Sequence, residues 1–285
     1  MKPRTIAIIQ ARMSSSRLPG KVLLDIAGEP MLARVVERAR RAKQVDQVVV
    51  ATTTDSSDDP VAEFCTEHGY DFTRGSLHDV LDRYYQSARQ FNADAIVRLT
   101  ADCPVLDPDV VDQTIAVIAS EARQSPSVGA EIASSQEHAP RNDVIFDFVA
   151  NRLPPPMGRT YPIGLDVEVC TFSALENAWT NATEKHQREH VMPYLYEGVN
   201  LQPSTYNLQT GVSTHNFKIA LLNHDPDYGS LRWTVDTPED LDFIREIFAR
   251  FNDDDFTWYD ILSLLEREPE LAKINADVHH KTLME

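Results

Sequence analysis

Hydrophobic positions follow two alternating periods along the first 120 residues. Short runs rich in β-branched residues predict strands at 5–10, 45–53, 71–73 and 95–100. Apolar residues at helical spacing predict helices at 31–41, 61–68, 79–91 and from Pro108 onward. Strands that alternate with helices form parallel crossover units. We therefore expect an α/β fold with a mostly parallel central sheet and helices on both faces.

This regular pattern stops between about residues 123 and 162. Turn-forming residues gather at 125–129, 138–142 and 154–158, which predicts an insertion or a substrate lobe beside the sheet. Beyond it, further β-rich segments are expected at 165–169, 217–222 and 231–235, and helices at 173–181, 188–197, 238–251 and 258–266. We expect one domain over residues 1–285, with C-terminal helices at about 238–285.

The composition is that of an ordinary globular protein, with 42% hydrophobic and 25% charged residues in 285 positions. No apolar run approaches the roughly 18 residues of a membrane span and no signal-like core opens the chain, so we expect a cytoplasmic protein without membrane contact. The cysteines Cys65, Cys103 and Cys170 are few and scattered, which predicts buried thiols in a reducing compartment. Trp179, Trp233 and Trp258 lie in apolar patterns typical of core residues.

Charge is divided unevenly along the chain. The net charge of −17 argues against nucleic acids and anionic membranes as partners. Residues 1–43 nevertheless hold ten Lys or Arg against three acids, which leaves −24 for residues 44–285 and suggests a site for a small anion near the start. Within this segment we interpret five cations as the solvated face of a helix: Arg34, Arg38, Arg40, Arg41 and Lys43. Arg12, Arg17 and Lys21 remain as candidates for anion binding.

The junction between the first strand and the first helix, Gln10 to Lys21, contains the candidate chemistry. Loops at the carboxyl ends of strands in open α/β sheets bind ligands. This loop has neither the glycine pattern of dinucleotide-binding proteins nor that of a Walker loop, and its serines, Ser14 to Ser16, lack a hydrolase elbow. Its three cations, three hydroxyls and backbone amides suit the charges of a triphosphate. The residues alone leave a merely basic surface loop as an equal alternative.

The string Ala11-Arg12-x-x-Ser15-x-Arg17-Leu18-Pro19-Gly20-Lys21 resembles the signature of the cytidylyltransferases that activate sugars, such as CMP-sialic acid and CMP-KDO synthetases. Four further segments resemble the spore coat polysaccharide biosynthesis protein F branch: Arg98 to Pro104, Gly164 to Glu168, Arg188 to His190 and Asp236 to Asp240. The resemblance implies a Rossmann-like nucleotide-diphospho-sugar transferase fold. It also implies transfer of CMP from CTP to a sugar, acidic or related, with release of pyrophosphate, for cell-surface polysaccharide.

The same resemblance implies roles for individual residues. Arg12 and Lys21 match positions that bind the triphosphate, Ala11 and Arg12 lie where the cytosine is read, and Ser15 and Arg17 belong to the same loop. Asp102 and Asp236 match the carboxylates that hold Mg²⁺. Both aspartates follow expected strands, so we expect them to project into one crevice as oxygen ligands. The resemblance further implies that Arg12, Lys21 and Asp102 are the catalytic residues.

Other residues are assigned more broadly. Gly75, Ser76 and Arg83 either contact the nucleotide or form a helix start capped by Ser76. CMP-KDO synthetases carry a Ser-Gly-Thr-Asp-Arg stretch where this chain has Asp79-Val-Leu-Asp82-Arg83, so KDO itself is not implied. We assign an acceptor-sugar pocket to Asp166, Glu168, Arg188, Glu189 and His190, with a core or interface histidine as the alternative for His190. His279 and His280 are expected in solvent.

Two other functions fit the sequence less well. Asp-x-Asp patterns at Asp107, Asp225 and Asp240 are compatible with a metal-dependent glycosyltransferase of similar fold. A non-catalytic nucleotide-binding protein is the second alternative. The expected partners are CTP, a small sugar and Mg²⁺, and a homodimer is possible because the family often pairs.

Overall fold

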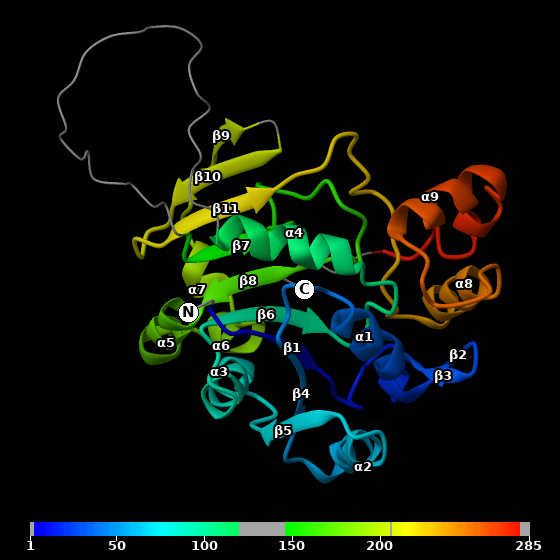
Figure 1. Ribbon diagram of the computed structural model, residues 1–285, viewed down its shortest axis with the longest axis horizontal. Helices are drawn as coiled ribbons and strands as arrows, with labels where there is room; N and C mark the ends of the chain where they lie inside the picture. The colour runs from blue at the N-terminus through cyan, green and yellow to red at the C-terminus, as the bar shows by residue number, and fades with distance from the viewer. Residues whose placement is uncertain (1–2, 120–145, 206, 280–285) are drawn as a thin grey trace, which may run out of the picture.

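The computed structural model describes residues 3–119, 146–205 and 207–279, and its centre is one nine-stranded sheet (Figure 1). The strands are β1 (Thr5–Gln10), β4 (Gln47–Thr53), β5 (Asp71–Gly75), β6 (Ala95–Thr100), β7 (Phe148–Ala150), β8 (Glu168–Thr171), β9 (Gln202–Thr205), β10 (Leu208–Val212) and β11 (Lys218–Leu222). Their order is β5-β4-β1-β6-β8-β7-β11-β10-β9. A separate small hairpin joins β2 (Asp25–Ile26) to β3 (Glu29–Pro30).

The half of the sheet that begins the chain is parallel. β1 lies between β4 and β6, with Ile9 aligned to Val50 and Leu99. From β8 onward the pairings are antiparallel except for β7 with β11. Because β1 and β6 run side by side in the same direction, Gln10 and Thr100 end together at one edge, where the loop after β1 begins.

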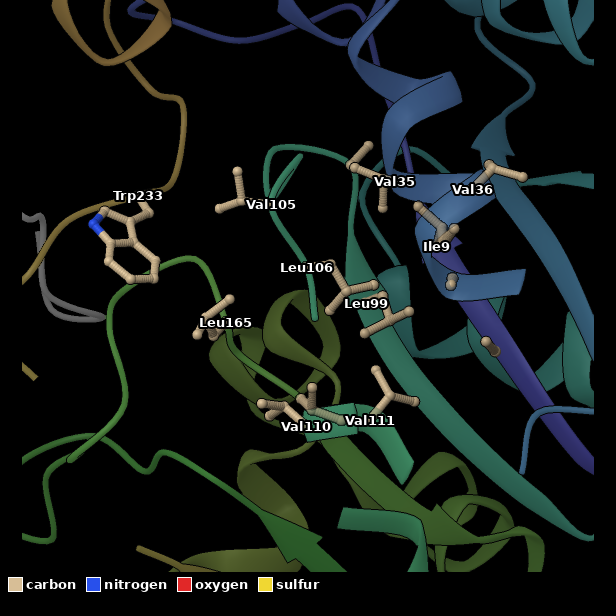
Figure 2. Close-up of a cluster of buried hydrophobic side chains, with 14 of the residues drawn as sticks. Ile9, Val35, Val36, Leu99, Val105, Leu106, Val110, Val111, Leu165 and Trp233 are labelled. Atoms are coloured by element: carbon tan, nitrogen blue, oxygen red, sulfur yellow. The ribbon is translucent and has the colours of Figure 1, made fainter. Parts of the chain in front are cut away.

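Helices cover both faces of the sheet, which confirms the expected α/β fold. One face is covered by α1 (Met31–Arg40), α2 (Asp59–Glu67), α4 (Pro108–Ala119), α8 (Pro238–Phe248) and α9 (Trp258–Arg267). The other is covered by α3 (Val80–Gln90), α5 (Phe172–Asn181), α6 (Lys185–His190) and α7 (Pro193–Tyr196). Alternate residues of β1 supply each layer, since Ile6 and Ile8 face one core and Ala7 and Ile9 the other. Figure 2 shows part of the first core, where side chains of α1 and α4 gather around Ile9 and Leu99.

The buried residues largely match the sequence expectation. Cys65, Cys103 and Cys170 are buried free thiols, and Trp233 and Trp258 are buried in the core. Trp179 is half-buried, stacked on Tyr85. Within the described residues, every helix is too short or too polar to cross a bilayer.

The expected helix over 188–197 is wrong, because the backbone breaks after His190. Val191 has φ 72° and ψ −58°, and the Met192 amide donates to the His190 carbonyl at 2.9 Å. This is a tight three-residue turn that a β-branched side chain rarely adopts. The chain therefore forms two short helices, α6 and α7, in place of one.

The expected strand over 231–235 is also wrong, although the segment is extended. Its hydrogen bonds go to loops: the Trp233 amide donates to the Ile163 carbonyl at 2.7 Å, and the Val235 amide to the Asp102 carbonyl at 2.9 Å. A single β-bridge joins Arg232 to Ile163, so no ladder forms. The second bond nevertheless places Asp236 beside Asp102.

The expected lobe at about 123–162 is only partly visible. Residues 120–145 lie outside the described residues, but β7, at 148–150, is inside the sheet and not beside it. Its apolar run is only three residues long and is flanked by turn-forming residues, so the sequence pattern did not indicate a central strand. β9 and β10 were not expected from their polar sequences. The division into one domain with a lobe stays a prediction.

Arg38 corrects the picture of a solvated basic helix. Its side chain is fully buried and donates to the carbonyls of Leu106 and Phe256 and to the Asp254 carboxylate, at 2.6–2.7 Å. It falls three residues after Val35, on the apolar side of α1. Arg34 and Arg41 also pair with Asp254, whereas Arg40 and Lys43 are exposed as expected.

Candidate active site

A cavity of about 230 Å³ opens at the carboxyl ends of β1 and β6. It is lined by residues of the loop after β1, of the β6 end and of the segment before α8: Gln10, Arg12, Ser14, Ser15, Ser16, Arg17, Lys21, Val22, Thr100, Ala101, Asp102 and Asp236. The structure therefore gathers the loop cations and both candidate metal ligands around one space, as the sequence predicted. Ala11, which is buried, lies at the base of the loop, where its amide donates to the Ala51 carbonyl.

The loop is held in a closed turn around Met13. The Met13 amide donates to Asp58 Oδ1 at 2.6 Å, and its carbonyl accepts from the Ser15 and Gly20 amides at 3.0 and 2.8 Å. Gly20 has φ 72°, a left-handed conformation that glycine adopts without strain. The chain then enters the 3₁₀ helix Lys21–Leu23, which turns Lys21 toward the cavity.

Lys21 joins the two aspartates. Its Nζ donates to Asp102 Oδ2 at 2.8 Å, Asp236 Oδ1 at 2.9 Å and the Val235 carbonyl at 2.7 Å. Burial alone would lower the pKa of Lys21, but the two carboxylates outweigh it and raise the pKa above its ordinary value. Burial likewise opposes ionisation of the aspartates. The Lys21 charge nevertheless holds the pKa of Asp102 below its ordinary value and that of Asp236 at about 2.

Asp236 is held on its second oxygen as well. Oδ2 accepts from Arg17 and Arg232, each at 2.9 Å. Arg232 is itself fixed by the fully buried Asp240, whose carboxylate also accepts from the Asp236 and Thr237 amides at the start of α8. Asp236 is thus the most tightly constrained carboxylate of the cavity.

Two guanidinium groups near the cavity have no carboxylate partner among the described residues. Arg12 is exposed and makes no ion pair with residues 3–119, 146–205 or 207–279. Arg83 is 2% exposed, and its Nη1 donates to the Ser76 carbonyl at 3.2 Å while its Nε has no partner. Burial, together with the charge of Arg12, lowers the pKa of Arg83. Gly75 leaves room for this side chain, because a Cβ there would lie 3.2 Å from Arg83 Cγ.

The expected alternative role of Ser76, as the N-cap of α3, is wrong. Asp79 caps the helix by accepting from the Asp82 amide at 2.9 Å, and Ser76 Oγ accepts from the Asp79 amide one turn earlier. An aspartate directly before the first helical residue is the stronger cap, since its charge also meets the helix dipole.

A second cavity, of about 160 Å³, adjoins the first through Thr100, Asp102 and Asp236. Asp166 and Glu168 line it, each paired with arginine. Glu168 meets Arg98 Nη1 at 2.5 Å, and Asp166 meets Arg159 Nη1 at 2.7 Å and Arg152 Nε at 3.4 Å. This cavity thus presents charged groups next to the shared aspartates.

The other residues assigned to the acceptor-sugar pocket do not line the second cavity. Arg188 forms a bidentate pair with Asp79 and donates to the Trp179 carbonyl at 2.7 Å, so it ties α6 to α3 and does not line the second cavity. Glu189 is exposed. His190 is half-buried, and burial lowers its pKa, with Arg98 and Arg152 near enough to add to this effect. His279 is exposed as expected, and His280 lies outside the described residues.

The Asp-x-Asp patterns serve local structure. Asp107 is buried and accepts amides at the starts of α4 and α9, and Asp227 accepts the Gly229 amide in a turn. Asp240 is engaged with Arg232, while its partner Asp242 is exposed. In the described part of the chain, no group of three or more His, Cys, Asp or Glu side chains is arranged to hold a metal.

Four residues of this site were missed at the sequence level: Asp58, Arg152, Arg159 and Arg232. Asp58 lies in a polar stretch, Asp55 to Asp59, that indicates only a turn. Arg152 and Arg159 belong to the segment expected to be irregular. A β-bridge joins Arg152 to Arg159, and both side chains pair with Asp166. No sequence pattern near these residues indicates that pairing.

Comparisons with known proteins identify the family of this chain. Residues 6–256 match the family model described as cytidylyltransferase. An uncharacterized protein of Methanocaldococcus jannaschii is 33% identical over 285 residues, covering 99% of this chain and 98% of that protein. The spore coat polysaccharide biosynthesis protein SpsF of Bacillus subtilis is 28% identical and covers 93% of this chain and 95% of its own. A solved cytidylyltransferase of Leptospira borgpetersenii has a TM-score of 0.76 at 28% identity, over 98% of this chain and 100% of that one. The chain therefore belongs to the cytidylyltransferase family.

Proposed function

We propose that this CTP-dependent nucleotidyltransferase transfers CMP from CTP to a hydroxyl of an acidic sugar, releases pyrophosphate and serves cell-surface polysaccharide synthesis. The observation that carries the proposal is the Lys21 ammonium, held between Asp102 and Asp236 where the two cavities meet. One cavity has the loop cations that a triphosphate needs. The other has the polar groups that a sugar needs.

The first cavity suits the nucleotide. Arg12 has no ion-pair partner among the residues that the structure describes, so it can bind phosphate oxygens without breaking an ion pair there. Arg17 and Lys21 lie across the same space. Because the pKa of Lys21 is raised, it stays an ammonium at neutral pH and acts by charge, not as a base.

The donor set fits Mg²⁺. Asp102 Oδ2 and Asp236 Oδ1 lie within 2.8 and 2.9 Å of one nitrogen, so both can reach a common cation. Magnesium takes one or two protein carboxylates and completes its shell with phosphate oxygens and water. When bound, it would orient the triphosphate and offset the charge that develops at the α-phosphate.

The chain's own residues then position the reaction. Asp166 and Glu168, fixed by Arg159 and Arg98, orient a sugar in the second cavity, whose shared wall with the first directs a hydroxyl toward the α-phosphorus. Arg12 and Lys21 stabilise charge on the phosphate oxygens as the bond to pyrophosphate breaks.

Arg152 is the residue that supports an acidic acceptor. It lines the second cavity, and the only ion pair or hydrogen bond of its side chain in the described residues joins Nε to Asp166, which leaves both terminal nitrogens available for hydrogen bonds. The Arg152→Gln substitution should raise KM for an acidic sugar by about 10- to 100-fold, the range of a lost charge-assisted hydrogen bond, and leave KM for CTP unchanged. Steady-state kinetics measures both. A reduced, uncharged form of the same sugar is the matched control and should show no difference between the variant and wild type. Equal effects on both sugars would contradict the assignment.

Asp58 should hold the nucleotide loop. Its buried carboxylate accepts from the Met13 amide and the Thr53 hydroxyl, so Asp58→Ala should lower the free energy of unfolding by about 2–4 kcal/mol and raise KM for CTP. Urea denaturation and kinetics test this. Asp55→Ala, which removes an exposed cap of the Ser57 amide, should cost only about 1 kcal/mol and leave KM unchanged. A normal KM in a folded Asp58→Ala protein would show that the loop does not need this anchor.

A pyrophosphate-release screen tests the function itself. Four nucleoside triphosphates are combined with acidic and neutral sugars in the presence of Mg²⁺. We expect release with CTP and an acidic sugar. Release of a nucleoside diphosphate from a sugar nucleotide would support a glycosyltransferase instead, and CTP binding without turnover would support a non-catalytic protein.

A further inference from the structure

We propose that the Lys21 ammonium, besides its role toward the phosphates, closes the site between Asp102 and Asp236 to divalent cations until the nucleotide arrives, so that the metal enters together with CTP. This inference rests on the proposed function, because it takes the two aspartates as the metal ligands. It concerns the order in which the site fills, which the chemistry of the reaction does not fix.

The first step of the argument is that the ammonium occupies the place of a metal. An ammonium has three N–H donors, and all three of Lys21 are used, on Asp102 Oδ2, Asp236 Oδ1 and the Val235 carbonyl. A divalent cation that bound the same two carboxylate oxygens would lie against the positive Nζ. The two cations therefore exclude each other, and the metal binds only when Lys21 leaves.

The second step is that few other oxygens are open. Asp236 Oδ2 accepts from Arg17 and Arg232, and the buried pair of Arg232 with Asp240 keeps it there. Asp236 thus offers a metal only the oxygen that Lys21 covers. No third His, Cys, Asp or Glu among the described residues completes a site, so the protein alone provides a poor shell.

The third step is that a nucleotide removes both obstacles. Its phosphate oxygens give Lys21 new acceptors within the same cavity. Arg12, which forms no ion pair with any residue in the described ranges, can bind phosphate first. The same phosphates supply the oxygens that the metal shell lacks. Displacement of Lys21 and entry of the metal are thereby coupled through the triphosphate.

Titration with Mn²⁺ in the absence of nucleotide tests the proposal, with free Mn²⁺ measured by electron paramagnetic resonance. Lys21→Met should bind Mn²⁺ about tenfold or more tightly than wild type, a typical size for coupling between competing ligands. Lys43→Met is the matched control, because Lys43 is exposed and its loss changes net charge equally; it should bind like wild type. Adding Asp102→Asn to Lys21→Met should abolish the gain. Binding by a folded Lys21→Met protein that is no tighter than wild type overturns the proposal.

A measurement on the wild-type protein does not depend on how that variant folds. The chain has seven lysines, so ¹⁵N-lysine labelling gives a simple spectrum in which the Lys21 Nζ signal is identified by its absence in Lys21→Arg. Millimolar Mg²⁺ alone should leave this signal in place, and Mg²⁺ with CTP should shift it. A shift with Mg²⁺ alone would overturn the proposal. The pyrophosphate assay separates this inference from the proposed function. If the wild-type enzyme releases pyrophosphate but either test gives the opposite result, only the inference about Lys21 is contradicted.

Discussion

Replacing Asp102 with asparagine should lower kcat/KM for pyrophosphate release by about 10²- to 10³-fold. Asp102 follows the end of β6 by two residues, and its Oδ2 is the oxygen that binds Lys21 and that a bound metal would use. Asparagine keeps the shape but removes the charge and half of the acceptor capacity. Lys21 keeps its bonds to Asp236 and Val235 in the variant, so we expect the fold to persist.

The control for this variant is Asp242→Asn. Asp242 is exposed on α8, and its ion pair in the described residues is a long one, 3.8 Å from Oδ1 to Arg245 Nη1. Its loss therefore changes net charge without touching the cavity. Its kcat/KM should match wild type, and circular dichroism should show both variants folded. A folded Asp102→Asn enzyme with wild-type kcat/KM would remove Asp102 from the proposed machinery.

Replacing Arg12 with alanine should lower kcat/KM for CTP by about 10²-fold, the size of one lost charge-assisted contact that strengthens in the transition state. Arg12 is exposed and makes no ion pair within the described part of the chain, so the folded state should lose little stability. Kinetics and thermal unfolding together separate these effects. The expected pattern is a large change in kcat/KM with an almost constant Tm.

Arg267→Ala is the matched control for Arg12. Arg267 is an exposed arginine near the end of α9 that likewise makes no ion pair in the described residues. Its loss should change neither kcat/KM nor Tm. If both arginine variants lowered kcat/KM alike, the effect would come from net charge, and a specific role for Arg12 would be contradicted.

Local signals explain why much of the fold could be predicted. The uninterrupted run Thr5–Gln10 is strand β1 with the expected bounds. The starts of α8 and α9 follow from Thr237 and Thr257, which form capping boxes with Asp240 and Asp260. These elements are specified by residues within one or two turns of each other, so a sequence pattern contains the information.

Errors arose where distant contacts decide the local structure. Residues 231–235 have a strand-like pattern, but their partners are the loops at Ile163 and Asp102, which the pattern does not reveal. The helix expected over 188–197 breaks at the Val191 turn, although valine gives no local signal for φ above zero. Arg38 is buried because Asp254, more than 200 residues later, meets its charge.

The candidate site divides in the same way. Topology alone placed the loop after β1 at the carboxyl edge of the sheet, and the resemblance singled out Lys21, Asp102 and Asp236, which lie within hydrogen-bonding distance. The residues that support them were not predicted. Asp58 holds the loop after β1 through the Met13 amide, 45 residues away in the chain, and Arg232 positions Asp236 through side-chain ion pairs. No regular spacing of residue types in the sequence indicates either contact.

A crystal structure with CTP and Mn²⁺, in which anomalous scattering locates the metal, tests the central claim most directly. We predict the triphosphate between Arg12 and Lys21, the metal on Asp102 and Asp236, and Lys21 moved from the carboxylates to the phosphates. A nucleotide outside the cavity after β1, or a metal at one of the Asp-x-Asp turns, would contradict the account.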